Sequence, residues 1–174
     1  MYCQSCVEHF YDRAVSVGIY ENALAASVLR LKRSPFIARR LKVMIVERAR
    51  QANLPAPSIV LPVPLSARRH RERGFNQAAV IARLVSKHLR LELDETVLTR
   101  RIHSPVHRAG MDKKARAMTV KDAFVVAHSR IVDGKNVLLV DDVMTSGETV
   151  SMCAKALKKS GAATVTVLTV ARAA

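Results

Sequence analysis

Residues 137–149, VLLVDDVMTSGET, constrain the fold of this 174-residue chain more than any other stretch. Four apolar residues end in two carboxylates, and a short loop of Thr, Ser and Gly then leads into an amphipathic pattern. A continuous apolar run of this kind predicts a strand that is buried on both faces, as in a parallel sheet. Asp141 and Asp142 would then lie at the carboxyl end of that strand, where open α/β sheets bind their ligands.

The loop after the carboxylates is suited to a phosphate group. Its backbone N–H groups and the N-terminus of the following helix favour an anion. Thr145, Ser146 and Thr149 add hydroxyl donors, and Gly147 lets the backbone approach a ligand closely. The two carboxylates suit sugar hydroxyls or a hydrated Mg²⁺ instead. The pattern therefore predicts a ligand with a diol at one end and a phosphate at the other, such as a ribose 5-phosphate.

Three other interpretations of the acidic pair fit the chain less well. A Walker B strand requires a G-x-x-x-x-G-K-[ST] loop, and the sequence contains none. A receiver-type acidic pocket draws on early strands, whereas this pair comes near the end of the chain. The third alternative is that Asp141 serves only as a turn or helix-capping residue.

The rest of the chain alternates between apolar runs and amphipathic stretches. Strands are predicted at 14–20, 59–63, 96–99, 123–126, 136–140 and 164–170, and helices at 21–33, 36–50, 76–89 and 149–160. The last helix is closed by Gly161 in the C′ position. This alternation predicts an α/β fold with a mainly parallel central sheet flanked by helices, and with a small N-terminal helical segment.

The chain is strongly basic, with 29 Lys and Arg against 14 Asp and Glu and a formal net charge of +15. Such a surplus indicates an anionic partner, whether nucleic acid, phosphates or a membrane surface. It is concentrated at 30–50, where solvated helix faces are the alternative explanation, and at 68–116. The second stretch includes RRHRER at 68–73, and cations crowded in a turn repel one another unless an anion lies among them. Because the chain has no Trp and only three Tyr and four Phe, we do not expect an aromatic base-stacking platform.

Cysteine usage and the N-terminus predict a cytoplasmic protein. Three cysteines are too few and too unevenly spaced for a disulfide framework, which favours a reducing compartment. The first residues lack the basic and apolar regions of a signal peptide. No uncharged apolar stretch reaches the ~18 residues that span a membrane, so membrane insertion is not expected.

Two motifs carry a resemblance to known proteins. Residues 137–149 resemble the motif of type I phosphoribosyltransferases that binds PRPP (5-phosphoribosyl 1-pyrophosphate). PVPLS at 62–66 and RERGFNQ at 71–77 resemble the signature of the ComF family, bacterial competence proteins with a phosphoribosyltransferase domain. The similarity runs from about residue 20 to residue 172. It departs at His107, where the family has Gln, and at Thr119, where it has Asn. The resemblance implies a type I phosphoribosyltransferase-like fold over residues 14–174.

The resemblance also implies a site, residue by residue. Asp141 and Asp142 would be the catalytic pair, binding the ribose hydroxyls and holding Mg²⁺ together with PRPP. The ribose and the 5-phosphate would also contact Val143, Met144, Thr145, Ser146, Gly147, Glu148 and Thr149. The pyrophosphate would bind Val63, Pro64, Leu65 and Ser66, with Arg68, Arg69 and Arg73 neutralising its charge. Arg101, Lys113, Lys114 and Arg116 would belong to a flexible loop over the site.

Cys3 and Cys6 form a CxxC pair, which is half of a zinc site, and His9 is a candidate third ligand. ComF relatives carry an N-terminal zinc module with a further Cys pair upstream. Residues 1–13 would therefore be the remnant of such a module, with an incomplete zinc site, as expected from a truncated start. Cys153 lies on the inward face of a predicted helix and is expected in the core.

Three functions follow from these observations. The first is a PRPP-binding protein of the ComF type that serves natural transformation or DNA uptake and transfers a phosphoribosyl group with release of pyrophosphate. The second is a non-catalytic, basic competence factor that binds single-stranded DNA or other competence proteins and keeps a relic PRPP site. The third is a housekeeping nucleobase phosphoribosyltransferase. The acidic pair within a basic chain points first to PRPP.

Overall fold

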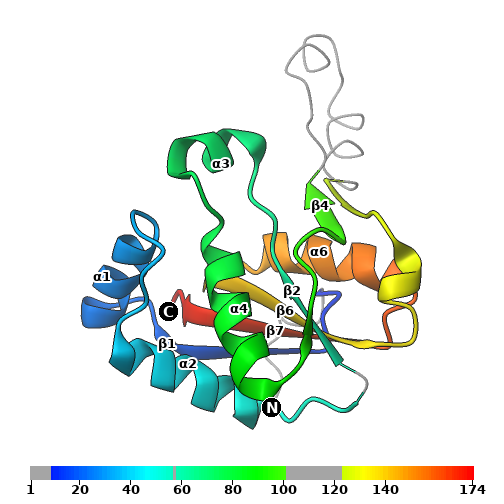
Figure 1. The fold of residues 1–174 in the computed structure, drawn as a ribbon, viewed down its shortest axis with the longest axis horizontal. Coiled ribbons are helices and arrows are strands. Elements are labelled where there is room, and N and C mark those ends of the chain that lie inside the picture. Colours follow the sequence, from blue (N-terminus) through cyan, green and yellow to red (C-terminus); the bar gives the residue numbers. More distant parts are fainter. Residues whose placement is uncertain (1–8, 57, 101–122) are drawn as a thin grey trace.

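The computed structural model describes residues 9–56, 58–100 and 123–174. In chain order (Figure 1), the elements are β1 (Arg13–Ile19), α1 (Asn22–Leu31), α2 (Arg39–Gln51), β2 (Ser58–Pro62), α3 (Ala67–Arg73), α4 (Gln77–Leu89), β3 (Glu92–Leu93), β4 (Leu98–Arg100), β5 (Phe124–Val126), the 3₁₀ turn η3 (Ser129–Ile131), β6 (Asn136–Met144), α6 (Glu148–Lys159) and β7 (Thr164–Arg172). None of the helices in these ranges is long and apolar enough to cross a membrane.

Five strands form one parallel sheet in the order β1-β7-β6-β2-β3. The central strands β6 and β7 have buried residues along most of their length, which fits the continuous apolar runs in their sequences. β4 and β5 pair separately as a short antiparallel ribbon. The predicted α/β fold with a mainly parallel central sheet is thereby confirmed.

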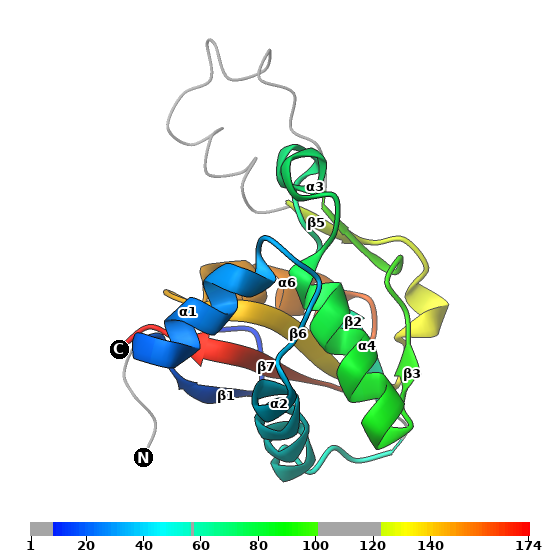
Figure 2. The ribbon, with the colours of Figure 1, turned by 60° about the vertical axis from the view of Figure 1, so that its left-hand side comes forward.

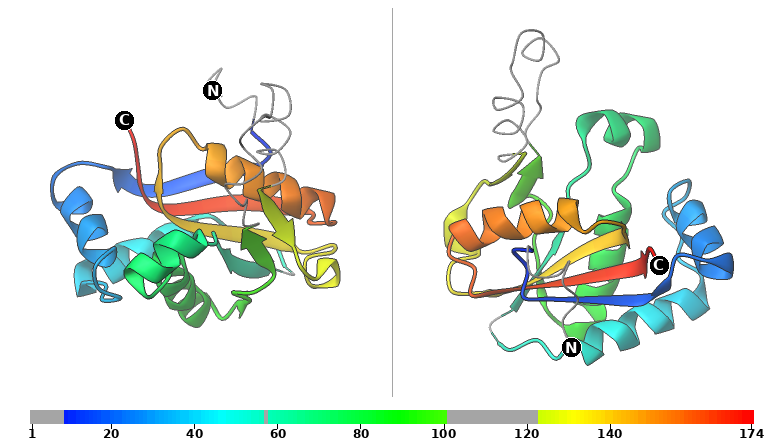
Figure 3. Two further views of the ribbon diagram at one scale, coloured as in Figure 1. Left: turned by 90° about the horizontal axis from the view of Figure 1, so that it is seen from above. Right: turned by 180° about the vertical axis from the view of Figure 1, so that it is seen from behind.

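Helices cover both faces of the sheet, as Figures 2 and 3 show. α1, α2 and α4 lie on one face, where Ile45 and Ile81 pack with Leu138 of β6. α6 and the β4–β5 ribbon lie on the other, where Leu157 packs in the same cluster as Leu139 of β6. Leu138 and Leu139 are adjacent in the sequence, and strand alternation sends them into opposite cores.

Most predicted elements occur within a few residues of their expected bounds. The helix expected at 21–33 ends at Leu31, and the one expected at 36–50 begins at Arg39. The strand expected at 136–140 continues to Met144 because β7 keeps pairing with it, up to Arg172 opposite Met144. Both carboxylates of the acidic pair therefore lie within the strand, not after it.

The turn expected at 68–73 is wrong, because these residues belong to helix α3. Ser66 Oγ accepts a hydrogen bond from Arg69 N at 3.3 Å at the start of α3, and Gly74, with φ of 75°, ends it. Within the helix, Arg68 Nε donates to Glu72 Oε1 at 2.7 Å. This hydrogen bond lowers the pKa of Glu72 and offsets part of the repulsion among the cations. α3 projects from the body of the domain (Figure 1).

Gly161 closes α6 with φ of +93°, as its predicted C′ position requires. A Cβ there would lie 2.2 Å from Asp133 Oδ1 and 3.3 Å from Asp133 Cα, whereas a Cβ on Gly134, with φ of +67°, would meet no atom within 4 Å. We expect Gly134→Ala to lower the free energy of unfolding by about 1–2 kcal/mol through its positive φ. Gly161→Ala should cost about 1–3 kcal/mol more, because the clash adds to the same strain. Urea denaturation measures both, and equal losses would contradict the close approach to Asp133.

Candidate functional site

The carboxyl ends of β2 and β6 lie side by side because the two strands pair in parallel, with Pro62 opposite Val140. The ladder extends one residue further, since Val63 N donates to Val140 O at 2.8 Å. The segment that follows β2 is thereby held beside Asp141 and Asp142. Parallel pairing therefore brings together two motifs that are more than sixty residues apart in the sequence.

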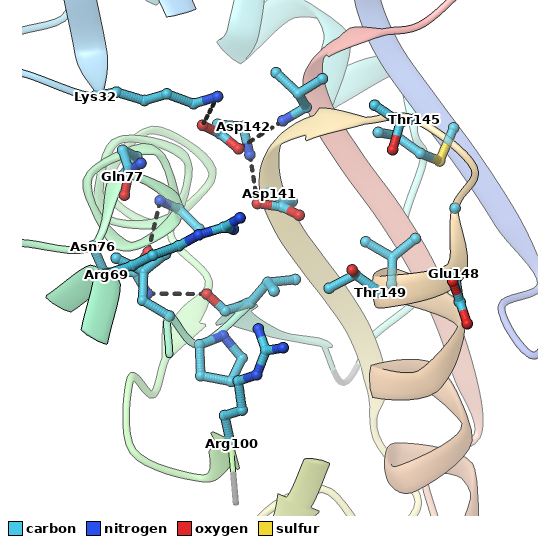
Figure 4. Close-up of a pocket in the computed structure, with 18 of the residues that line it drawn as sticks. Lys32, Arg69, Asn76, Gln77, Arg100, Asp141, Asp142, Thr145, Glu148 and Thr149 are labelled. Carbon is cyan, nitrogen blue, oxygen red and sulfur yellow. Dashed lines mark hydrogen bonds and ion pairs between the residues drawn. The ribbon is translucent and has the colours of Figure 1, made fainter. Parts of the chain in front are cut away.

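A pocket of about 340 Å³ opens at this edge of the sheet (Figure 4). It is lined by Lys32, by Val63, Pro64 and Leu65, by Arg69 and Arg73 of α3, by Asn76, Gln77 and Ala78, by Arg100 of β4, and by residues 141–150. Most residues that the sequence predicted for the site lie in this lining. Two do not line it: Ser66 caps α3, and Arg68 is paired with Glu72. Arg101, Lys113, Lys114, Arg116, Cys3 and Cys6 lie outside the described residues.

The two carboxylates of the acidic pair are held by backbone donors. Asp141 Oδ1 accepts a hydrogen bond from Asp142 N at 2.8 Å, and Asp142 Oδ1 accepts one from Val143 N at 2.9 Å. Burial, followed by the neighbouring charge of Asp142, raises the pKa of Asp141 to about 8. The Asp141 carboxyl therefore mostly carries a proton at neutral pH. Asp142 Oδ2 lies 3.6 Å from Lys32 Nζ, an ion pair too long for a hydrogen bond.

The opposite side of the pocket is the start of α6. Gly147, with φ of +74°, is the N-cap, and it brings no capping side chain. Ser146 Oγ accepts from Glu148 N at a long 3.4 Å. The first N–H groups of α6 therefore keep most of their capacity to bind an anion. Thr145, Glu148 and Thr149 lie on this side in Figure 4.

Asn76 fixes the third side of the pocket, where the segment after β2 turns back to α4. Its Oδ1 accepts from Ala78 N at 3.0 Å, so Asn76 is the N-cap of α4. Its Nδ2 donates to Val63 O at 3.0 Å and so holds the backbone that follows β2. Arg69 and Arg100 approach the same side (Figure 4). Backbone groups and two guanidiniums thus form a cradle with positive charge.

Six lining residues were not predicted for the site: Lys32, Asn76, Gln77, Ala78, Arg100 and Val150. Lys32 comes from the end of α1, and its contact with Asp142 depends on tertiary packing that no local pattern encodes. Arg100 is the last residue of β4 and directly precedes Arg101, which the resemblance assigns to a flexible loop over the site. Gln77 begins α4 and is only 2% exposed, although glutamine is rarely buried. The available sequence signal for Gln77 was a polar residue on the inward side of the first turn of a predicted helix.

Comparison with known proteins first shows the class of protein to which the fold belongs. Residues 75–174 match the family model described as a phosphoribosyl transferase domain. The fold resembles that of the glutamine PRPP amidotransferase from B. subtilis, with a TM-score of 0.50 and 18% identity over 74% of this chain and 25% of that chain. Fold and family model together define a type I phosphoribosyltransferase-like domain.

Three relatives narrow the family. The chain is 32% identical to Competence protein F of Haemophilus influenzae over 99% of this chain and 79% of that protein. It is 33% identical to the DNA utilization protein YhgH of Salmonella typhi, over 90% of this chain and 70% of that protein. Competence protein ComFC of Bacillus subtilis matches at 29% identity over 66% of this chain and 44% of that protein. The chain belongs to the ComF family of proteins with a phosphoribosyltransferase domain.

The raised pKa of Asp141 predicts a pH-dependent stability. Its pKa rises from 3.8 to about 8 on folding, so the folded chain binds more protons than the unfolded chain between these values. Stability must then fall as the pH rises through this window. Asparagine at this position cannot ionise. We therefore expect Asp141→Asn to gain stability relative to the wild type from pH 5 to pH 8 and to level off above that. Urea denaturation of both proteins without ligand or metal measures the difference, and a difference that is flat with pH would contradict the burial of this carboxyl.

Proposed function

We propose that this chain binds PRPP in the pocket between β2, β6 and α6, and that it transfers the phosphoribosyl group with release of pyrophosphate. The observation that carries the proposal is the convergence of an acidic pair, an uncapped helix N-terminus and a cationic backbone cradle in one pocket. A ligand that satisfies all three has a diol between two phosphate groups. PRPP has this arrangement.

The ends of the ligand are distinguished by charge and by donor type. The 5-phosphate binds the N–H groups of residues 145–149, where the helix N-terminus favours an anion. The pyrophosphate binds the cradle at 63–65, with Arg69 and Arg100 offsetting its charge. The ribose lies between these two ends, with its 3-hydroxyl donating to the acidic pair at Asp141 and Asp142. This assignment accounts for acidic side chains at the centre of a pocket whose two ends suit anions.

A divalent cation fits the carboxylates, provided that the ligand brings it. The part of the chain that the structure describes holds no group of three or more His, Cys, Asp or Glu that would bind a metal by itself. Asp141 and Asp142 are hard oxygen ligands of the kind that hydrated Mg²⁺ takes together with phosphate oxygens. When bound, Mg²⁺ neutralises charge on the pyrophosphate as it leaves. The two carboxylates would hold it.

In the reaction, the bond between C1 of the ribose and the pyrophosphate oxygen breaks, and C1 forms a bond to the acceptor. Arg69 and Arg100 stabilise the charge that the pyrophosphate gains. The loop at 145–149 and the carboxylates hold the ribose while its C1 reacts. The names of the relatives refer to competence and DNA utilization, and we propose that this reaction serves the same processes. The role is therefore in natural transformation or DNA uptake.

PRPP with Mg²⁺ should raise the thermal stability of the wild-type chain. At a hundred times Kd, ligand binding stabilises by about 2.7 kcal/mol, which shifts Tm by several degrees. The double variant Asp141→Asn/Asp142→Asn should lose the shift. The matched control Glu21→Gln/Glu47→Gln, which removes two exposed carboxylates outside the pocket, should keep it. Differential scanning fluorimetry measures all three.

The absence of a shift in the wild type, or an equal shift in the Asp141/Asp142 double variant, contradicts the proposed binding site. Release of pyrophosphate distinguishes transfer from binding alone. Turnover with a free nucleobase would instead favour the housekeeping phosphoribosyltransferase. Binding without release of pyrophosphate would leave a non-catalytic PRPP-binding protein.

A second candidate function, binding of single-stranded DNA, is favoured by the surface of α1 and α2. Phe36 is 55% exposed, and its ring centroid lies 5.5 Å from Arg30 Cζ and 5.8 Å from Lys42 Nζ. Leu29 of α1 and Val43 of α2 are also half exposed. A base that stacks on this exposed ring would displace a cation from the ring face, and the displaced cation could then bind a phosphate. The low count of aromatic residues gave no sign that one of them is placed in this way.

DNA binding at this surface predicts a steep salt dependence. The affinity for a single-stranded oligonucleotide should fall as salt rises, with a log–log slope of about −0.7 for each phosphate contacted. Phe36→Ala should weaken binding by about 1–3 kcal/mol if one base stacks on the ring. Arg30→Gln/Lys42→Gln should reduce the slope, and the control Lys87→Gln/Lys159→Gln, with the same change in charge, should not. Fluorescence anisotropy at several salt concentrations measures both effects. An oligonucleotide affinity that does not change with salt concentration, or that is the same in Phe36→Ala as in the wild type, would argue against this function.

A further inference from the structure

One wall of the pocket carries hydrogen-bonding capacity that the chain itself leaves unused. Gln77 is 2% exposed, and its Oε1 has no hydrogen-bond partner. Asp142 Oδ2 is also buried without one, although Lys32 Nζ lies 3.6 Å from it. Among the described residues, these are the two buried side-chain atoms with this property. Both residues line the same pocket, together with Lys32, and Figure 4 shows the three on one side of it.

The folding of α4 does not explain the buried oxygen of Gln77. The N-cap of α4 is Asn76, whose side chain accepts from Ala78 N. Gln77 Oε1 makes no hydrogen bond within the helix or to the sheet. A buried acceptor without a donor is costly and uncommon in native proteins. Two such acceptors in one pocket therefore indicate a ligand that supplies a donor.

The chemistry of the wall selects the kind of group it binds. Gln77 Oε1 and Asp142 Oδ2 are acceptors, and the Lys32 ammonium is a donor. A hydroxyl donates one hydrogen bond and accepts others, so it complements both kinds of group. An ammonium group only donates, and a phosphate oxygen without a proton only accepts. The wall is therefore suited to a hydroxyl group of the ligand.

The position of Gln77 identifies which hydroxyl this is. Gln77 directly follows Asn76, whose Nδ2 donates to Val63 O of the cradle. Gln77 is thus at the end of the pocket assigned to the pyrophosphate, away from residues 145–149. The pyrophosphate is attached to C1 of the ribose, and the hydroxyl next to C1 is the 2-hydroxyl.

We propose that Gln77 is a specificity-determining residue that accepts a hydrogen bond from the 2-hydroxyl of the ligand and makes the pocket select ribosyl over 2-deoxyribosyl phosphates. This inference rests on the proposed PRPP site and adds a residue outside the acidic pair. Lys32 completes the contact by donating to the same hydroxyl. In a ligand without the 2-hydroxyl, the Gln77 oxygen stays buried and unpaired, which is the basis of the selection.

The test compares ribose 5-phosphate with 2-deoxyribose 5-phosphate, each competing against PRPP in the presence of Mg²⁺. The wild type should prefer ribose 5-phosphate by about tenfold or more, the usual effect of one unpaired buried acceptor. Gln77→Met, which keeps the side-chain length and removes the acceptor, should reduce this preference about tenfold. The loss should fall on ribose 5-phosphate and leave the affinity for the deoxy sugar unchanged. Gln77→Glu, which keeps an oxygen acceptor, should retain the preference.

A matched control is Thr166→Val on β7, which removes a buried polar group outside the pocket and should change neither affinity. Equal losses for both sugars in Gln77→Met would mean that Gln77 only holds the fold, and an unchanged preference would mean that the hydroxyl is read elsewhere. Either result overturns the inference, as does failure of ribose 5-phosphate to compete. If Gln77→Met does not fold, the wild type and Gln77→Glu still decide, because absence of a preference in both overturns the inference. The wild-type PRPP titration is independent: absence of PRPP binding refutes the proposed function, whereas PRPP binding without a sugar preference refutes only the role of Gln77.

Discussion

The parallel pairing of β2 with β6 is the interaction on which the rest of this structure depends. Residues 58–62 and 136–140 align side by side, and the hydrogen bond from Val63 N to Val140 O extends the ladder to the sheet edge. Because parallel strands end at the same edge, the backbone after β2 must lie beside Asp141 and Asp142. The two cores on either side of the sheet hold this register, since a slip by one residue would exchange the faces of Leu138 and Leu139.

That register places acidic side chains inside a strongly basic chain, and the resulting electrostatics define what the pocket can bind. Asp141 keeps a proton at neutral pH because burial and the neighbouring charge of Asp142 raise its pKa by more than Lys32 lowers it. The charge of Asp142 is balanced by Lys32, which follows α1. A ligand that brings hydroxyl donors or a cation to the centre, and negative charge to both ends, compensates all of these groups together. Lys32, Arg69, Arg73 and Arg100 of the pocket, and Arg30 and Lys42 beside Phe36, contribute to the net charge of +15.

Local sequence patterns were sufficient to predict the fold and to place the acidic pair at the carboxyl edge of the sheet. The apolar run before Asp141 predicted a buried strand, and the pattern at 76–89 predicted helix α4. Helix α3 was not predicted, because the cations at 68–73 were expected to repel one another. The hydrogen bond between Arg68 and Glu72, which offsets part of this repulsion, forms only at the i, i+4 spacing of a helix. Lys32 and Gln77 were not predicted for the pocket, since their places in it depend on how α1 and α4 pack on the sheet.

The central claim is that one pocket holds the whole of PRPP, with a sugar-phosphate half at α6 and a pyrophosphate half at the cradle. The most direct measurement is a calorimetric titration of PRPP with Mg²⁺, repeated after saturation with ribose 5-phosphate and, separately, with pyrophosphate. The expected result is one site per chain, with PRPP affinity weakened by each half-ligand. Absence of PRPP binding, or PRPP binding that neither half-ligand weakens, would contradict a PRPP site at this edge of the sheet.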